Sequence, residues 1–175
     1  AINSLAVLAA AAAAGADLDA AAASLAGLSP PKGRGQRHRV GSGDRSFELI
    51  DDSYNASPVS MRAAFDVLAA AAPAPGGRRI AVLGDMLELG PDSPRLHAGL
   101  AESLVANRID LVFTCGQFMA CLHDALPAPL RAGHAANSEQ LAPMVRAAIR
   151  PGDVVMVKGS FGSRMGRIVE ALLAG

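Results

Sequence analysis

The stretch LIDDSYNASP, residues 49–58, holds the densest group of side chains that could do chemistry. It places two adjacent carboxylates, several hydroxyls and an amide between an apolar strand and the start of a predicted helix. Adjacent side chains at a strand end point to opposite sides, so one of Asp51 and Asp52 can face a cleft while the other supports the loop. A carboxylate that accepts hydrogen bonds from sugar hydroxyls is a common way to hold a ribose. The segment therefore predicts a nucleoside contact, and the alternative is a polar loop with capping residues.

A second candidate is Lys158-Gly159-Ser160, which follows an apolar strand and precedes a predicted helix. Backbone N–H groups at such a place bind anions, and we expect the Lys158 ammonium to project into a crevice with its head exposed. The alternative is an ordinary exposed turn. The sequence has neither a Gly-x-x-x-x-Gly-Lys-[Ser/Thr] loop nor a Gly-x-Gly-x-x-Gly motif after a strand. The phosphate-binding loop of any ATP chemistry must therefore come from elsewhere.

Two further segments are polar and lie next to predicted strands or boundaries. The turn GDMLELG, residues 84–90, sets Asp85 and Glu88 among apolar residues. Asp85 either starts a loop that apolar neighbours anchor, or contacts a ligand directly. The arginines of GRGQR, residues 33–37, are either solvated spacers or groups that reach a phosphate.

Apolar periodicity predicts strands and helices in turn along the chain. Strands are predicted near residues 37–40, 47–50, 79–83, 111–114, 132–135 and 154–157, the first two as a hairpin. Helices are predicted near residues 3–14, 18–26, 58–72, 93–107, 117–125, 138–149 and 162–174, with Asp17, Ser57 and Ser138 as N-caps. Strands that alternate with helices predict an α/β fold with a doubly wound, mostly parallel sheet. Ligands of such sheets bind beyond the carboxyl ends of the strands, where the polar clusters stand.

The N-terminal region differs in composition from the rest. Residues 1–28 read as two alanine-rich helices, and residues 29–37 as a linker rich in Pro, Gly and basic side chains. No basic segment precedes the alanine run, and alanine is only weakly apolar, so a signal peptide is not expected. No run of about 20 strongly apolar residues is present to span a bilayer. We expect residues 1–32 to be a fragment of one domain and residues 33–175 to form a second domain.

Charge and cysteine content exclude several classes of function. Lys+Arg and Asp+Glu each total 16, and the chain has no Trp and one Tyr, so nucleic acid is not an expected partner. Cys115 and Cys121 are too few for a disulfide framework and are read as buried residues in a reducing compartment. The histidines lie far apart in sequence, and we expect no metal site.

The ordered series GRGQR, IDDSYNASP, LGDMLELG and VKGS resembles the Mur ligase family. LGDMLELG with DDSYNA is typical of the member that adds D-alanyl-D-alanine. The resemblance covers residues 33–175 and implies a Rossmann-like C-terminal ligase domain. The helices of residues 1–32 resemble the end of the family's central ATPase domain, which would be a partner within the same protein.

The resemblance implies a cytoplasmic, ATP-dependent step of peptidoglycan precursor synthesis. In it, the carboxylate of a UDP-N-acetylmuramoyl-tripeptide is activated as an acyl phosphate with ATP and Mg²⁺. The amine of D-alanyl-D-alanine then attacks to form the amide. Because this chain lacks the phosphate loop, we expect it to be inactive alone and to bind no cofactor tightly.

Roles for individual residues follow from the same resemblance. Asp52 would accept from the ATP ribose, and Arg34 would approach the nucleotide from the linker. Lys158 and Ser160 would line the site where dipeptide and reaction centre meet, as the catalytic pair. The other two nucleotide-binding candidates, Tyr54 and Asn55, belong to the Asp52 motif.

The sequence departs from the family pattern in three places. Ser57 stands where the family usually has Asn, Phe161 where Arg often follows KGS, and Gly166 where Glu often follows Met. Two alternative functions stay open. One is a non-catalytic Rossmann-like module that binds a nucleotide or a partner protein. The other is a sibling Mur ligase with a different amino-acid substrate, which LGDMLELG opposes.

Overall fold

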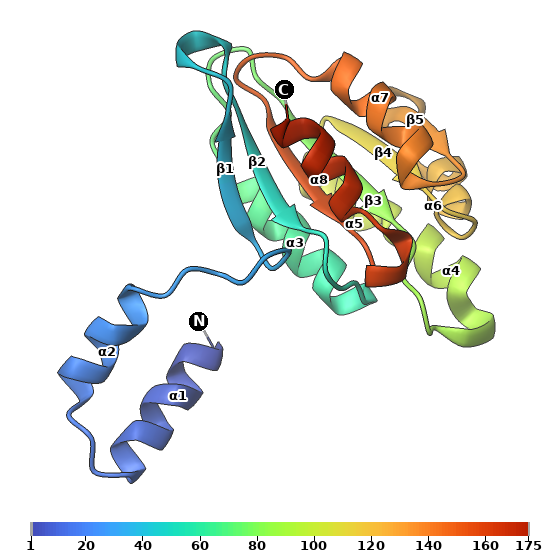
Figure 1. Cartoon of the computed structure of the whole chain (residues 1–175). Helices are drawn as coiled ribbons and strands as arrows, with labels where there is room; N and C mark the ends of the chain where they lie inside the picture. Colours follow the sequence, from blue (N-terminus) through green and yellow to red (C-terminus); the bar gives the residue numbers. More distant parts are fainter. Residues whose placement is uncertain (1, 175) are drawn as a thin grey trace. The chain divides into compact units, whose positions relative to one another are not determined.

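The computed structural model describes residues 2–174, with side chains from residue 4 (Figure 1). The chain divides into two compact units, residues 1–30 and 31–175, which we describe separately. No helix in the described part of the chain is long and apolar enough to cross a membrane.

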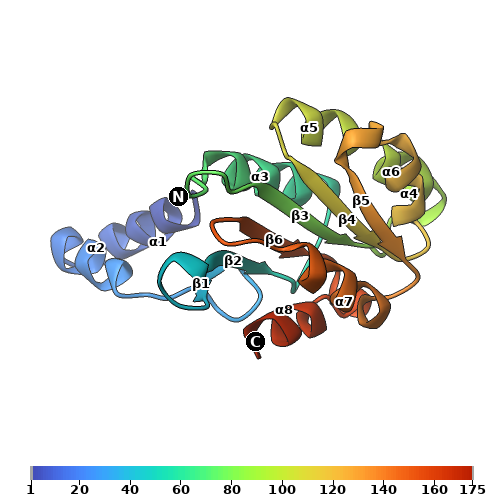
Figure 2. The same cartoon turned by 90° about the horizontal axis from the view of Figure 1, so that it is seen from above.

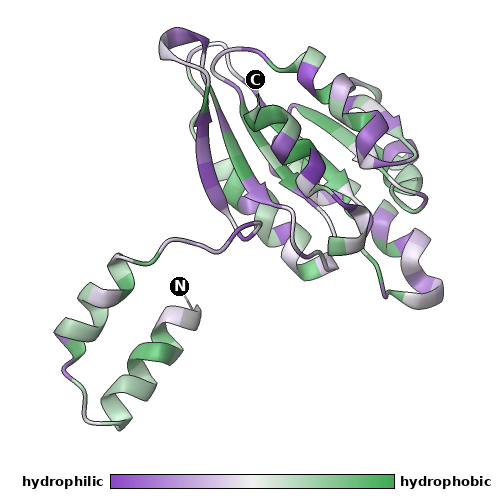
Figure 3. Cartoon of the chain, in the orientation of Figure 1, coloured by the Kyte–Doolittle hydropathy of each residue, from purple (hydrophilic) through white to green (hydrophobic). Residues whose placement is uncertain are grey.

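The first unit consists of two helices, α1 (Ile2–Ala13) and α2 (Leu18–Ala26). The predicted cap is confirmed, because the Asp17 carboxylate accepts from the N–H groups of Asp19 (2.8 Å) and Ala20 (2.9 Å). Such caps satisfy N–H groups that have no partner inside the helix. All nine residues of α2 are described and none of them is buried, although both helices are largely apolar (Figure 3).

The second unit is built on a single sheet, and the predicted α/β fold is confirmed. Within residues 31–174, six strands lie in the order β1-β2-β6-β3-β4-β5. Only β1 runs antiparallel to its neighbour, so the sheet is mostly parallel. The strands are β1 (Gln36–Val40), β2 (Phe47–Asp52), β3 (Arg79–Gly84), β4 (Leu111–Cys115), β5 (Arg131–Ala135) and β6 (Val154–Lys158). The edge strand β1 is hydrophilic, whereas the central strands are apolar (Figure 3).

Helices cover both faces of the sheet (Figure 2). One face carries α3 (Pro58–Ala70), α4 (Ser93–Ala98), α5 (Ala101–Ala106) and α6 (Met119–Ala125); the other carries α7 (Ser138–Ala148) and α8 (Gly166–Leu173). Each face has its own apolar core. Side chains of β6 alternate between these cores, with Met156 on the α3 face and Val157 on the α8 face. The same alternation places Ile50 of β2 on the α3 face and Leu49 on the α8 face.

Three helix predictions were wrong in detail. The single helix expected at 93–107 is two helices, because the chain turns at Gly99, a residue with low helix propensity. The cap of α7 is Asn137, whose side chain accepts from the Gln140 N–H (3.0 Å), and not Ser138. The last helix begins at Gly166 rather than Gly162, since the left-handed Arg164 (φ 54°) separates it from a short 3₁₀ turn.

Candidate functional site

The parallel strands bring the polar clusters to one edge of the sheet. Asp52 of β2 is the register partner of Lys158 of β6, which in turn lies opposite Leu83 of β3. Gly84 at the end of β3 is paired with Cys115 at the end of β4. The carboxyl ends of β2, β6, β3 and β4 therefore meet at the edge where such sheets bind ligands.

An ion pair between neighbouring strands stands at the centre of this edge. The Lys158 ammonium donates to Asp52 Oδ2 (2.6 Å) and to the carbonyl oxygen of Asn55 (2.9 Å). Lys158 is only 3% exposed, whereas the Asp52 side chain is 25% exposed. The expectation of an exposed lysine head was wrong, because the ammonium follows the alternation of β6 onto the α3 face and meets its partners there.

Asp51 takes the opposite role to Asp52, as the alternation predicted. Its buried carboxylate accepts from the N–H (3.2 Å) and hydroxyl (2.6 Å) of Ser53 and from the N–H of Gly33 (3.2 Å). One of the two adjacent carboxylates therefore fixes the loop, and the other faces the cleft.

The GRG segment is attached to the end of β2 rather than being a free spacer. Gly33 and Gly35, on either side of Arg34, have positive φ angles of 74° and 85°, which glycine adopts without strain. The Gly35 N–H donates to the Asp51 carbonyl (2.8 Å), and the Gly33 carbonyl accepts from the Tyr54 N–H (3.0 Å). Arg34 is therefore held beside the strand end.

A pocket of about 410 Å³ opens at this place. It gathers four of the six predicted site residues, namely Arg34, Asp52, Asn55 and Lys158. Five further lining residues, Gly33, Gly35, Arg37, Ile50 and Ser57, belong to the two motifs that the sequence singled out. No sequence signal pointed to the rest of the wall, which comes from α3 and β6: Ser60, Ala63, Ala64, Val67 and Met156. Its polar lining thus combines a carboxylate, an ammonium, an amide and two guanidinium groups, those of Arg34 and Arg37, and the rest of the wall is mostly apolar.

The other two predicted residues lie outside this pocket. The Ser160 hydroxyl is buried, accepts from the Leu87 N–H (3.0 Å) and lies 3.5 Å from the Ala56 carbonyl oxygen. Tyr54 is 46% exposed and lies against Phe161, with ring centroids 5.6 Å apart. A catalytic role for Ser160 stays a prediction.

The GDMLELG turn anchors the neighbouring helix. The Asp85 carboxylate accepts from the N–H groups of Met119 (2.8 Å) and Phe118 (3.1 Å), at the start of α6. A side chain at Gly116 would collide with this carboxylate, so only glycine fits there. Of the two interpretations of Asp85, these contacts support the structural one.

A residue that the sequence did not reveal holds the same turn. His97 is fully buried; its Nε2 accepts from the Met86 N–H (2.9 Å) and its Nδ1 lies 2.7 Å from the Ser93 carbonyl oxygen. Because a carbonyl only accepts, Nδ1 must be the protonated nitrogen. The spacing of Ser93 and His97 on one helix face was a signal for their contact, but nothing in the sequence pointed to Met86.

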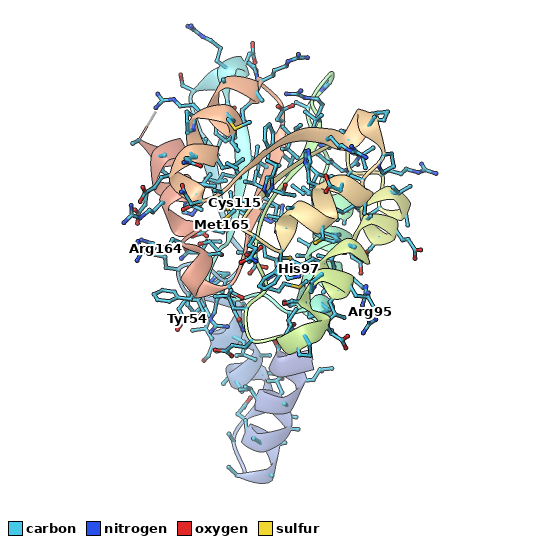
Figure 4. The ribbon with its side chains drawn as sticks, turned by 90° about the vertical axis from the view of Figure 1, so that its right-hand side faces the viewer. Tyr54, Arg95, His97, Cys115, Arg164 and Met165 are labelled. Atoms are coloured by element: carbon cyan, nitrogen blue, oxygen red, sulfur yellow. The ribbon has the colours of Figure 1, made fainter. Side chains whose placement is uncertain are left out.

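Cys115, the last residue of β4, lies in contact with Met165 (Figure 4). Burial, and then the negative charge of Asp85, raise the pKa of the Cys115 thiol to about 12.

Among the described residues, no group of three or more His, Cys, Asp or Glu side chains could hold a metal ion.

The fold and this edge define a doubly wound α/β domain with a ligand pocket at the carboxyl ends of its parallel strands. The chain belongs to the Mur ligase family, because residues 33–161 match the family model described as "Mur ligase, glutamate ligase domain". The resemblance inferred from the motifs is thereby confirmed.

Curated relatives and solved structures agree with this assignment. The chain is 35% identical over 191 residues to the UDP-N-acetylmuramoyl-tripeptide–D-alanyl-D-alanine ligase of Mycobacterium tuberculosis, covering 98% of this chain and 37% of the relative. MurF from Acinetobacter baumannii matches with a TM-score of 0.80 and 26% identity, covering 99% of this chain and 37% of that one. MurF ligase from Thermotoga maritima, in complex with ADP, matches with a TM-score of 0.76 and 25% identity, covering 95% and 36%. The chain spans about a third of the length of the curated relatives it matches.

The buried ion pair makes Lys158 important for stability. Lys158→Ala should lower the free energy of unfolding by about 2–3 kcal/mol, because it leaves a partly buried carboxylate and a carbonyl without their donor. Lys32→Ala is the matched control, since the Lys32–Glu170 pair is exposed on both sides and should contribute nothing measurable. Urea unfolding of both variants measures the difference. Equal midpoints for Lys158→Ala and the unsubstituted chain would show that the pair is not stabilising.

The two cysteines should differ in reactivity. The thiolate is the reactive form, so at about pH 8 a thiol whose pKa is near 12 should resist alkylation. We expect iodoacetamide to label the half-buried Cys121 first and Cys115 only after unfolding. Peptide mass spectrometry at increasing labelling times distinguishes the two sites. Labelling of Cys115 in the folded chain as fast as in urea would contradict the burial of its thiol.

Proposed function

We propose that this chain is the C-terminal part of a cytoplasmic, ATP-dependent ligase that joins D-alanyl-D-alanine to UDP-N-acetylmuramoyl-tripeptide. The names of the relatives support this substrate pair, and the match covers almost the whole of this chain. On this proposal, residues 1–32 end a central ATPase domain and residues 33–175 form the C-terminal domain. The exposed apolar side chains of the first unit, including Leu5 and Leu28, suit helices that pack against a larger domain.

The pocket at the Asp52–Lys158 pair is the observation that carries the proposal. Lys158 occupies Oδ2 of Asp52, and the second oxygen, Oδ1, can accept from the hydroxyl groups of a ribose. Arg34 brings a planar cation to the same pocket, suited to phosphate oxygens. The volume of about 410 Å³ lies within the usual range of small-molecule sites. These residues fit the nucleoside end of ATP.

The remaining parts of the chemistry belong to other regions on this proposal. ATP supplies the phosphoryl group that activates the tripeptide carboxylate. Mg²⁺ and the phosphate-binding loop would lie outside this chain, since the sequence has no such loop and the carboxylates at this edge already accept from Lys158, Ser53 and backbone N–H groups. We therefore propose that Lys158 acts on the reaction by fixing Asp52 and the carbonyl of Asn55. Ser160 would support the turn at Leu87 beside the dipeptide.

Domain replacement tests the proposed function. The chain matches 36% of the Escherichia coli relative, and we expect it to restore D-alanyl-D-alanine ligation when it replaces that part. The isolated chain should form no product. The same replacement with the corresponding part of the Bacillus subtilis relative, which is 32% identical to this chain, is the matched control. An active control beside an inactive but folded chimera with this chain would contradict the proposal.

The role of Asp52 is tested in the same chimera. Asp52→Ala removes a charge-assisted acceptor and should raise the KM for ATP roughly 10- to 100-fold. The KM for the dipeptide should change less. Lys158→Met in the same chimera keeps the Asp52 carboxylate but removes the ammonium that holds it. It therefore separates loss of the acceptor, Asp52, from loss of the group that fixes it. An unchanged KM for ATP in Asp52→Ala would return Asp52 to a purely structural role.

A further inference from the structure

An aromatic stack adjoins the nucleotide pocket through Arg34. The guanidinium carbon of Arg34 lies 4.4 Å from the centroid of the Tyr54 ring, within the range of a cation–π contact. The same ring also neighbours Phe161, whose ring is tilted by 53° to it at a centroid distance of 5.6 Å, a favourable aromatic geometry. Three residues from three segments, the linker, the β2–α3 loop and the β6–α8 loop, therefore form one stack.

In this stack the Tyr54 Cβ packs against the linker backbone, whereas the rings of Tyr54 and Phe161 are exposed. A side chain at Gly33 would meet Tyr54 Cβ at 3.0 Å, so the linker backbone packs directly on the tyrosine. Phe161 is 74% exposed and Tyr54 is 46% exposed, so neither ring is part of the apolar core. Arg34 lines the nucleotide pocket, whereas Tyr54 and Phe161 line a separate depression, and Gly33 lines both. Tyr54 can thus influence the pocket through Arg34.

We propose that Tyr54 is a positioning residue that holds the Arg34 guanidinium at the nucleotide pocket, and that the contact with Phe161 fixes the tyrosine ring in place. The inference rests on the proposed function, because it assigns Arg34 to ATP. An arginine on a long, flexible side chain loses conformational entropy when it binds a phosphate. A ring that holds the guanidinium beforehand reduces this cost, which should appear in nucleotide binding.

A double-mutant cycle in the Escherichia coli chimera tests the effect on ATP. Tyr54→Leu should raise the KM for ATP about 2- to 5-fold, the size of one partly exposed cation–π contact, and leave the KM for the dipeptide unchanged. Tyr54→Phe keeps the ring and should restore the KM. In an Arg34→Ala background, Tyr54→Leu should have no further effect. Val105→Ala, at a position of similar exposure, is the control.

An NMR measurement on the 175-residue chain tests the contact between Arg34 and Tyr54 without an enzyme assay. The Nε–Hε resonance of Arg34 should be shifted upfield by the Tyr54 ring, retained in Tyr54→Phe, and moved toward the free-arginine position in Tyr54→Leu. Phe161→Ala should reduce the shift, because the ring loses the contact that fixes it.

The two experiments separate the possible failures. If the Arg34 resonance is the same in Tyr54→Leu and in the unsubstituted chain, Tyr54 does not position Arg34. This conclusion holds for any activity of the chimera. An equal rise in KM with and without Arg34 also overturns the positioning role, because Tyr54 would then act through a contact of its own. An inactive chimera with an upfield Arg34 resonance contradicts the proposed function but still supports the positioning of Arg34 by Tyr54.

Discussion

The site depends on one contact, the ion pair between Lys158 at the end of β6 and Asp52 at the end of β2. Both side chains leave their strands toward the α3 face, and the two residues are register partners, so the sheet itself brings the charges together. A buried ammonium without a partner would be strongly unfavourable. The third participant, the carbonyl of Asn55, ties the loop after β2 to the same cation. Strand register, loop conformation and pocket wall are therefore parts of one arrangement.

The sequence predicted the elements well because local signals specify them. The alternating strands and helices, the hairpin of the first two strands and the Ser57 cap of α3 each follow from nearby residues. The division of labour between Asp51 and Asp52 also followed from local geometry, since adjacent residues on a strand face opposite ways. Four of the six predicted site residues line one pocket. Asp52, Asn55 and Lys158 meet there because polar residues at strand ends gather at the ligand edge, whereas Arg34 was proposed from the family resemblance.

The error at the site itself concerns a contact between distant segments. The exposed head expected for Lys158 was wrong because its partners are 106 and 103 residues away, and the sequence does not show that β6 lies between β2 and β3. The same holds for His97, whose ring bonds the backbone of another loop. Local ambiguity explains the Asn137 cap, since Asn and Ser are nearly equal as capping residues.

A double-mutant cycle on the ion pair tests the account most directly. Asp52→Asn, Lys158→Met and the double variant would be unfolded in urea beside the unsubstituted chain. The account predicts that the two substitutions are not additive, with a coupling free energy of about 1–3 kcal/mol, because each single variant leaves the other group without its partner. Additivity to within about 0.5 kcal/mol would mean that the two groups do not interact, and would contradict the central role of this contact.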